Sequence, residues 1–136
     1  MTGNTHKFCA DLHCHSTVSD GVYSPEEVAT RAHACGVTLW ALTDHDEVSG
    51  QHRARVAAEA LGMQYLSGVE ISVTWANQTV HIVGLGINPD DPRLVQGLHE
   101  TRDGRAGRAR RIGARLAELG MPGACLLYTS PSPRDS

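Results

Sequence analysis

Eight histidines occur in this chain of 136 residues, and two of them stand together in His13-Cys14-His15. Side chains alternate between the two faces of an extended segment, so His13 and His15 point to one face and Cys14 points to the other. Two imidazoles on one face can clamp a divalent metal ion, whereas Cys14 is interpreted as a packing residue. A His-x-His pair alone is a weak signal, because most such pairs are incidental.

Further candidate ligands stand at or near the ends of predicted strands. Glu70 and His81 each lie between apolar residues, so each either faces solvent or has a partner. Because a buried polar group without a partner is costly, a bound metal is the favoured interpretation. Asp20 precedes Gly21 and, taken alone, is typical of a turn. Imidazoles combined with carboxylates suit zinc, manganese or iron. The candidate metal ligands are therefore His13, His15, Asp20, His45, Glu70 and His81.

Turn and capping signals predict the elements that position the first of these side chains. A strand is expected over residues 8–13, followed by a turn through residues 19–21. The next helix begins with a capping box, in which Ser24 is the N-cap and Glu27 stands three residues later. This helix is expected to end near Gly36.

A nearly continuous apolar run over residues 37–43 predicts a strand that is buried on both faces. His45 then lies at the C-terminal edge of that strand. Asp44 and Asp46 flank this histidine, and we interpret Asp44 as a group that orients an imidazole. The remaining expected elements are a helix over 51–61 closed by Gly62, strands over 64–73 and 79–87 joined by a turn at 75–78, and a helix over 93–119 with a break allowed at Gly104 or Gly107. Strands alternating with helices predict a mostly parallel α/β sheet.

Composition places the chain among soluble globular domains. With 40% hydrophobic and 20% charged residues, it has enough apolar material for one modest core. A net charge of -3 gives no general case for binding nucleic acid or an anionic membrane, and no apolar run is long enough to span a bilayer. The four cysteines form no CxxC pair, and no signal peptide is recognised, so we expect a cytoplasmic protein.

The last twelve residues, 125–136, differ from the rest, with two Ser-Pro pairs and no helical period. Residues 125–135 resemble a conceptual translation of a common sequencing-library adapter. We therefore expect 125–136 to be a non-native tail and leave it out of the fold, with Ala124 as the last genuine residue. The gene is then expected to have been cut off in an assembly.

The motifs DLHCHS, TDHDEVSG, GVEIS and VHIVGLGI follow one another along the chain. In this order they resemble the polymerase and histidinol phosphatase (PHP) family of metal-dependent phosphoesterases, over residues 9–124. Within the family, the chain is most similar to the bacterial group of nucleoside 3',5'-bisphosphate phosphatases and short-RNA 5'-3' exonucleases. The resemblance implies an α/β fold, the N-terminal half of a distorted (β/α)7 TIM-like barrel, since such barrels typically need about 250 residues.

The implied domain organisation has a flexible N-terminus over 1–7 and a truncated PHP domain over 8–124, in which 90–124 is helical and leads into an insertion. The resemblance also implies up to three divalent metal ions: manganese, zinc or iron. Carried over to this sequence, the ligands are His13 and His15 for one metal, Glu70 as a bridge to a second metal with His81, and Asp20 with His45 for a third. The family's later ligands have no counterpart here, so the truncated chain is expected to be inactive.

The reaction implied for the parent protein is hydrolysis of a phosphate monoester or diester by metal-activated water. The expected substrate is a nucleotide, a short oligonucleotide or another phosphorylated small molecule, and no protein partner is predicted. Arg105 and Arg108 are predicted to grip a substrate phosphate, because guanidinium forks match phosphate oxygens, although a solvated charged face is the default interpretation. Two alternatives stay open: a histidinol-phosphatase-like enzyme, and a non-catalytic PHP module that binds metal.

Overall fold

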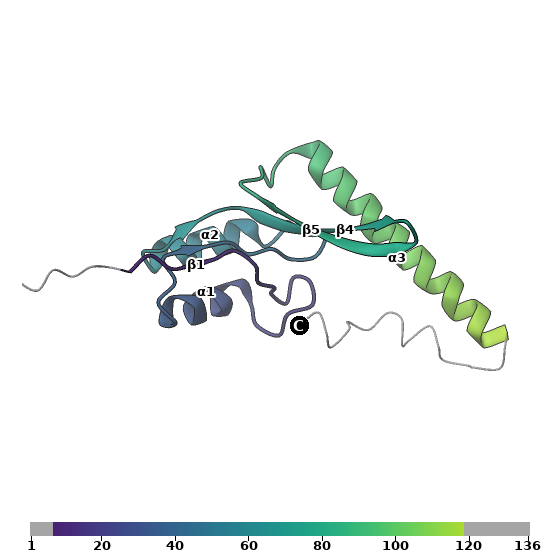
Figure 1. Cartoon of the computed structure of the whole chain (residues 1–136), viewed down its shortest axis with the longest axis horizontal. Helices are drawn as coiled ribbons and strands as arrows, with labels where there is room; N and C mark the ends of the chain where they lie inside the picture. The colour runs from purple at the N-terminus through teal and green to yellow at the C-terminus, as the bar shows by residue number, and fades with distance from the viewer. Residues whose placement is uncertain (1–6, 119–136) are drawn as a thin grey trace, which may run out of the picture.

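The computed structural model describes residues 7–118, except for the side chains of residues 108, 109, 112, 113 and 115–117. Residues 1–6 of the expected N-terminal segment, residues 119–124 and the expected tail over 125–136 therefore lie outside the described residues. In chain order the elements are β1 Ala10–Asp11, α1 Pro25–Ala34, β2 Leu39–Trp40, α2 Gln51–Ala60, β3 Gln64–Tyr65, β4 Gly68–Trp75, β5 Gln78–Leu85 and α3 Pro92–Glu118 (Figure 1).

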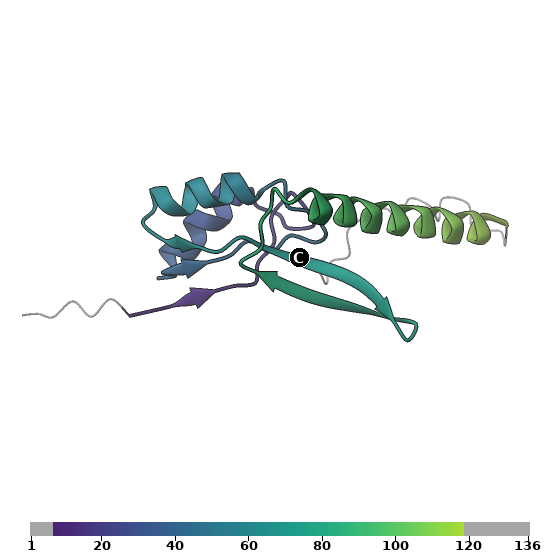
Figure 2. The ribbon, with the colours of Figure 1, turned by 90° about the horizontal axis from the view of Figure 1, so that it is seen from above.

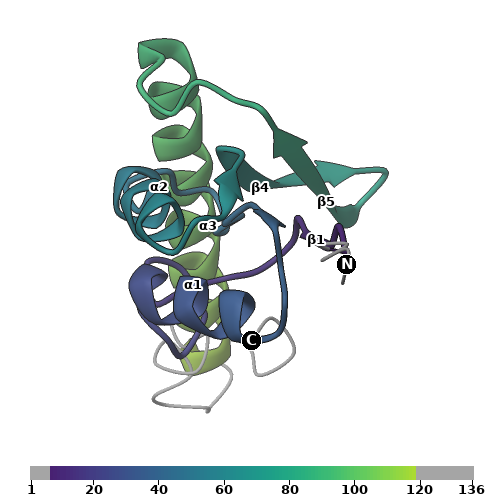
Figure 3. The ribbon, with the colours of Figure 1, turned by 90° about the vertical axis from the view of Figure 1, so that its left-hand side faces the viewer.

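A small parallel sheet with the strand order β1-β2-β3 organises the first half of the chain. Helices α1 and α2 pack against each other and cover one face of this sheet (Figures 2 and 3). The core cluster between helices and sheet is Ala29, Val37, Trp40, Leu42, Ala54, Ala58, Met63 and Tyr65. The strand and helix alternation predicted from the sequence is confirmed for this half.

The predicted capping box begins α1. The Ser24 hydroxyl accepts a hydrogen bond from the Glu27 backbone N–H at 3.2 Å, and the Glu27 carboxylate accepts one from the Ser24 N–H at 3.1 Å. Both donors would otherwise lack a partner at the helix start. The helix ends as expected, with Gly36 in the left-handed region at φ +87°. This end directs the chain back into β2.

The segment over 37–43 is buried as predicted, although only β2 within it has regular pairing. Trp40, Ala41, Leu42 and Thr43 expose none of their surface. Beyond β2 the Thr43 N–H still donates to the Cys14 carbonyl at 2.8 Å. The residues after β1 and those after β2 therefore stay side by side up to the candidate ligands.

The strand expected over 64–73 is instead two strands, and this prediction was wrong. β3 pairs parallel to β2, whereas β4 pairs antiparallel to β5. The chain changes partners at Ser67, whose carbonyl accepts from the Gly86 N–H at 2.8 Å. The turn between β4 and β5 lies where expected, with Ala76 at φ +48° and Asn77 at φ +63°, which suits a tight hairpin. The prediction of a mostly parallel sheet therefore does not hold for the hairpin of β4 and β5.

The strand expected over 79–87 is confirmed as β5, and much of it is exposed. Ile82 is 52% exposed and His81 is also exposed. The hairpin extends away from the parallel sheet (Figure 2). Within residues 7–118, only β4 pairs with β5. An apolar pattern predicts a strand, but it does not say which element covers that strand.

Helix α3 is continuous, without the break that was allowed at Gly104 or Gly107. Leu98 of this helix packs against Val48 and Val69 in a second small core cluster. The C-terminal part of α3 runs away from the rest of the fold (Figure 1). Among the described helices, none combines the length and hydropathy needed to cross a membrane.

Candidate metal centre

All six predicted ligands converge at one place, beyond the carboxyl ends of β1 and β2. His13, His15 and Asp20 lie in the segment after β1, His45 follows β2, Glu70 is in β4 and His81 is in β5. An isolated parallel bridge between His45 and Glu70 joins the parallel sheet to the hairpin. This bridge connects the two parts of the fold at the ligands themselves. The ends of parallel strands are a common position for functional side chains.

The first group of potential ligands is His13, His15 and Glu70. The Nε2 atoms of the two histidines are 3.3 Å apart. The two carboxylate oxygens of Glu70 face different rings, with Oε1 3.0 Å from His13 Nε2 and Oε2 3.4 Å from His15 Nε2. The expectation that His13 and His15 share a face is therefore confirmed.

The second group is His15, Asp20 and His45. The rings of His15 and His45 stack with centroids 4.4 Å apart and an interplanar angle of 6°. Asp20 lies beside both rings, with Oδ2 3.3 Å from His45 Nε2 and Oδ1 3.9 Å from His15 Nδ1. Asp20 is thus part of the cluster and more than a turn residue.

The third group is His45, Glu70 and His81. Glu70 Oε2 is 2.9 Å from His45 Nδ1, and the ring centroids of His45 and His81 are 5.3 Å apart. The Ser72 hydroxyl lies 3.2 Å from His81 Nδ1, so Nε2 is the ring nitrogen of His81 that can serve as a ligand. Within each of the three groups the potential ligand atoms all lie within 4.8 Å of one another.

Two buried nitrogen atoms show that the cluster suits a cation. His15 Nδ1 and His45 Nδ1 are buried and have no hydrogen-bond partner among the described residues, although Glu70 Oε2 lies close to the latter. Buried polar atoms are normally satisfied, and unpaired ones call for an explanation. Four imidazoles and two carboxylates also form a donor set that zinc, manganese and iron accept. The residues present therefore fit divalent metal ions.

The protonation of His15 favours the same interpretation. Burial of the ring lowers the pKa of His15 from its ordinary value, and the neighbouring His45 lowers this pKa further. Glu70 and Asp20 act in the opposite direction but do not reverse the shift. His15 is therefore neutral at neutral pH, which is the state in which an imidazole binds a metal.

Neither aspartate beside His45 makes a hydrogen bond to an imidazole among the described residues. The Asp44 carboxylate, which was expected to orient an imidazole, accepts hydrogen bonds from Ser16 and Ser19. Asp46 is buried at φ +48°, and its Oδ1 accepts from the Ser72 N–H at 2.9 Å. Sequence reasoning missed both serines, since serines in a turn are too common to signal a role.

Cys14 is a packing residue, as predicted. Its thiol donates to the Ala41 carbonyl at 3.3 Å and accepts from Trp40 Nε1 at 3.1 Å. Burial raises the pKa of Cys14 from 9.0 to about 12. A thiol that stays protonated is a poor nucleophile, which argues against thiolate chemistry here.

The two arginines predicted to grip phosphate lie on α3. Arg105 is half exposed, and its guanidinium is 2.9 Å from Asp46 Oδ2 in an ion pair that does not form a regular hydrogen bond. Arg102, which the sequence did not single out, donates to the Asp46 carbonyl and lies 3.2 Å from Glu47. The side chain of Arg108 lies outside the described part of the chain.

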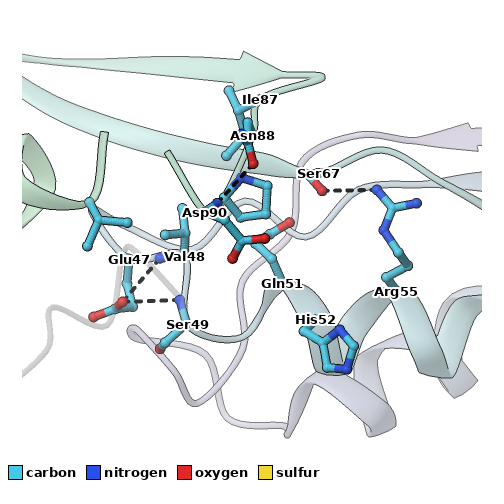
Figure 4. Close-up of a pocket in the computed structure, with 12 residues that line it drawn as sticks. Glu47, Val48, Ser49, Gln51, His52, Arg55, Ser67, Ile87, Asn88 and Asp90 are labelled. Atoms are coloured by element: carbon cyan, nitrogen blue, oxygen red, sulfur yellow. Dashed lines mark hydrogen bonds between the residues drawn. The ribbon is translucent and has the colours of Figure 1, made fainter. Parts of the chain in front are cut away.

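A separate groove of about 720 Å³ lies between the start of α2 and the connection from β5 to α3 (Figure 4). Arg55 on its wall donates to the Ser67 hydroxyl at 3.1 Å, and Glu47 accepts from the N–H groups of Val48 and Ser49. None of the six candidate ligands lines this groove. We assign it no part in metal binding.

Comparison with known proteins agrees with this geometry. The family model described as the PHP domain matches residues 11–99. A 3',5'-nucleoside bisphosphate phosphatase of Chromobacterium violaceum is 51% identical over 113 residues, which make up 83% of this chain and 40% of the relative. A 5'-3' exoribonuclease of Haemophilus influenzae is 45% identical over 114 residues, 84% of this chain and 42% of the relative. The chain thus spans about two fifths of the length of these relatives.

A solved structure extends the likeness to three dimensions. An amidohydrolase from Chromobacterium violaceum, with bound sulfate and no metal, superposes with a TM-score of 0.76 at 46% sequence identity. The match covers 93% of this chain and 46% of that chain. The mixed α/β fold class expected from the sequence is confirmed, as part of a PHP-type fold.

Proposed function

This chain belongs to the PHP domain family, whose model matches residues 11–99, and on this premise we propose that its protein is a metal-dependent phosphoesterase. The proposed substrate is a phosphate monoester or diester of a nucleotide or a short oligonucleotide. The names of the relatives at 51% and 45% identity support this substrate class. We also propose residues 8–124 as the extent of the PHP segment.

The observation that carries this proposal is the convergence of four imidazoles and two carboxylates from four segments of the chain. Such a cluster is costly without a cation, because it buries carboxylates beside ring nitrogens that have no hydrogen-bond partners. Bound metal ions, which we propose to be zinc, manganese or iron, up to three in number, would relieve this cost. When bound, such ions lower the pKa of water and neutralise charge on phosphoryl oxygens.

Glu70 has the central role among the proposed ligands. Its Oε1 faces His13, whereas its Oε2 faces both His15 and His45, so one carboxylate joins two ligand groups. His13 and His15 complete one group, and His81 completes the other at the open edge of the hairpin. Asp20 with His45 serves the remaining group.

Arg105 and Arg108 are the proposed contacts for a substrate phosphate. They lie three residues apart on α3, and residues at this spacing share one side of a helix. Arg105 already pairs with Asp46 close to the metal cluster. A phosphate that binds Arg105 therefore has to compete with, or share, this carboxylate.

Metal titration of the 136-residue chain tests the proposal directly. After chelation and dialysis, the chain is expected to bind Zn²⁺ or Mn²⁺ with up to one ion for each of the three ligand groups. His13→Ala should lower the number of ions that this chain binds, measured by elemental analysis. In the full-length parent protein the same change should abolish phosphate release from a nucleoside 3',5'-bisphosphate. His33→Ala is the matched control, because His33 is exposed on α1 and belongs to none of the ligand groups. A native chain that binds neither metal would refute the proposal.

A further inference from the structure

Asp44 is a fully buried carboxylate that is not a member of any of the three ligand groups. It follows β2 and directly precedes His45. We propose that Asp44 is a positioning residue, which holds His15, Asp20 and His45 in the arrangement that a metal needs. This inference rests on the proposed metal-binding function and adds a residue to it.

The contacts of Asp44 are short and specific. Oδ1 accepts from the Ser16 backbone N–H at 2.7 Å and from the Ser19 hydroxyl at 2.7 Å. Oδ2 accepts from the Ser16 hydroxyl, also at 2.7 Å. Hydrogen bonds to an ionised carboxylate are stronger than neutral ones, and burial strengthens them further. Three such bonds restrain the loop between Ser16 and Ser19 tightly.

The residues that Asp44 bonds to are neighbours of candidate ligands in the sequence. Ser16 directly follows His15, Ser19 directly precedes Asp20, and Asp44 directly precedes His45. One carboxylate therefore joins residues adjacent to all three members of the second ligand group. The carbonyl of Asp44 also accepts from the Glu70 N–H at 3.1 Å, so Asp44 is also bonded to a fourth candidate ligand.

Backbone hydrogen bonds also close the loop from Ser16 to Gly21, so a restraint on Ser16 and Ser19 also restrains Asp20. The Ser19 and Gly21 N–H groups both donate to the Ser16 carbonyl, at 3.1 and 2.8 Å. A Cβ atom on Gly21 would lie 2.5 Å from the His15 carbonyl oxygen, so only glycine allows this approach. The backbone around Asp20 thus has little freedom once Asp44 holds the two serines.

A role in general stability would involve different neighbours. Among the described residues, the carboxylate bonds of Asp44 reach only the loop that carries His15 and Asp20, whereas the core cluster consists of apolar residues. Removing the carboxylate is therefore expected to loosen the ligand loop and leave α1, α2 and the core in place. Residues that hold metal ligands in this way typically contribute 10- to 100-fold to metal affinity, as an order of magnitude.

Amide hydrogen exchange on the metal-free 136-residue chain tests the restraint itself. Asp44→Asn keeps the shape but removes the negative charge that strengthens all three hydrogen bonds. Exchange at the Ser16 N–H should therefore accelerate by about tenfold or more, while amides of α1 exchange as in the native chain. Ser19→Ala should give a smaller acceleration, and Ser19→Thr, which keeps the hydroxyl, should restore the native rate. Native exchange at Ser16 in both Asp44→Asn and Ser19→Ala would overturn the inference.

Zinc titration of the same variants tests the consequence for the ligands. Asp44→Asn should weaken zinc binding by about 10- to 100-fold, with Ser19→Thr again matching the native chain. Unchanged zinc binding in Asp44→Asn and Ser19→Ala would also overturn the inference. Absence of zinc binding by the native chain would instead refute the proposed function, and the Ser16 exchange rates would still decide whether Asp44 fixes the loop.

Discussion

At the scale of single residues, Glu70 is the ligand whose loss should cost most. Glu70, like His15 and His45, takes part in two of the three ligand groups, but it alone of these three is a carboxylate, and it is only 5% exposed. The exposed His81 takes part in one group. Glu70→Gln keeps the size of the side chain but removes the charge that offsets a divalent cation. We expect it to lose two zinc equivalents where His81→Ala loses one, measured by elemental analysis after dialysis.

The control for this change is Glu59→Gln, which alters an exposed carboxylate on α2 and should bind zinc like the native chain. Equal zinc binding by Glu70→Gln and the native chain would contradict the bridging role.

The reactivity of the cysteines gives a second test at this scale. The pKa of Cys14 is raised to about 12 by burial, whereas the thiol titrates at 9.0 without that burial. Because only the thiolate reacts with iodoacetamide, Cys14 should be labelled about a thousandfold more slowly than an unburied thiol near pH 8. Cys35, which is exposed, is the internal reference. Peptide mass spectrometry measures both rates in one sample.

The sign of the pH effect follows from the same values. The raised pKa stabilises the folded chain fully below about pH 9, and this contribution is lost as the pH rises toward 12, since the unfolded thiol ionises first. In urea Cys14 should become as reactive as Cys35. Fast labelling of Cys14 in the folded chain would contradict its assignment as a packing residue.

The sequence predicts the ligands better than it predicts what surrounds them. Histidines and carboxylates at strand ends stand out by residue type and position. Asp20 is the exception, because alone it is typical of a turn, and only its place in the order of motifs singles it out. Asp44 also stands out by residue type and position, but its partners could not be predicted, because Ser16 and Ser19 meet it only after the loop folds back over Gly21. Hydrogen bonds between distant segments leave no periodic signal in the sequence.

At the scale of elements, the sequence predicted where helices begin and end, but it did not predict which strands pair with each other. The capping box of α1 and the glycine that follows α2 both depend on residues within a few positions, and both were confirmed. The division of 64–73 into β3 and β4 depends on β2 and β5, which pair with different parts of that run. No pattern within the run distinguishes a parallel partner from an antiparallel one.

The contact between α3 and Asp46, the residue after His45, can be tested by mutation. Asp46 is buried, and its Oδ2 has only the Arg105 guanidinium within ion-pair distance among the described residues. Arg105→Ala leaves this oxygen unpaired, which should lower the free energy of unfolding by about 1–3 kcal/mol in urea denaturation. Arg93→Ala on the same helix is the control, since Arg93 is 92% exposed and its loss should change stability by less than about 0.5 kcal/mol. Equal effects of the two variants would show that Arg105 does not hold α3 to Asp46.

At the scale of the whole molecule, the exposed face of β5 should govern behaviour in solution. Val80 and Ile82 share one face of β5 and are 38% and 52% exposed, and the second edge of β5 has no partner strand within residues 7–118. Exposed apolar strands with an open edge favour association. We expect the 136-residue chain to form larger species as its concentration rises, measured by light scattering after size-exclusion chromatography.

Ile82→Lys should reduce this association, because it places a charge on the open strand. Val56→Lys is the matched control, since Val56 on α2 is also 52% exposed but is not part of an open sheet edge. A native chain that remains a monomer at every concentration would show that β5 does not associate through this face.

The exposure of the candidate metal ligands to solvent is expected to lower the catalytic activity of the 136-residue chain. His13 has 56% of its side chain exposed, and His81 on β5 is also exposed, so solvent reaches the cluster at both residues. Precise placement of reacting groups matters greatly, and a misplacement of about 1 Å can cost about 100-fold in rate. We therefore expect the 136-residue chain to hydrolyse a nucleoside 3',5'-bisphosphate with a kcat/KM at least about 100-fold below that of the Chromobacterium violaceum phosphatase assayed in parallel. His13→Ala identifies any residual turnover that does not depend on this cluster. Turnover equal to that of the relative would mean that the described ligands suffice for catalysis despite their exposure to water.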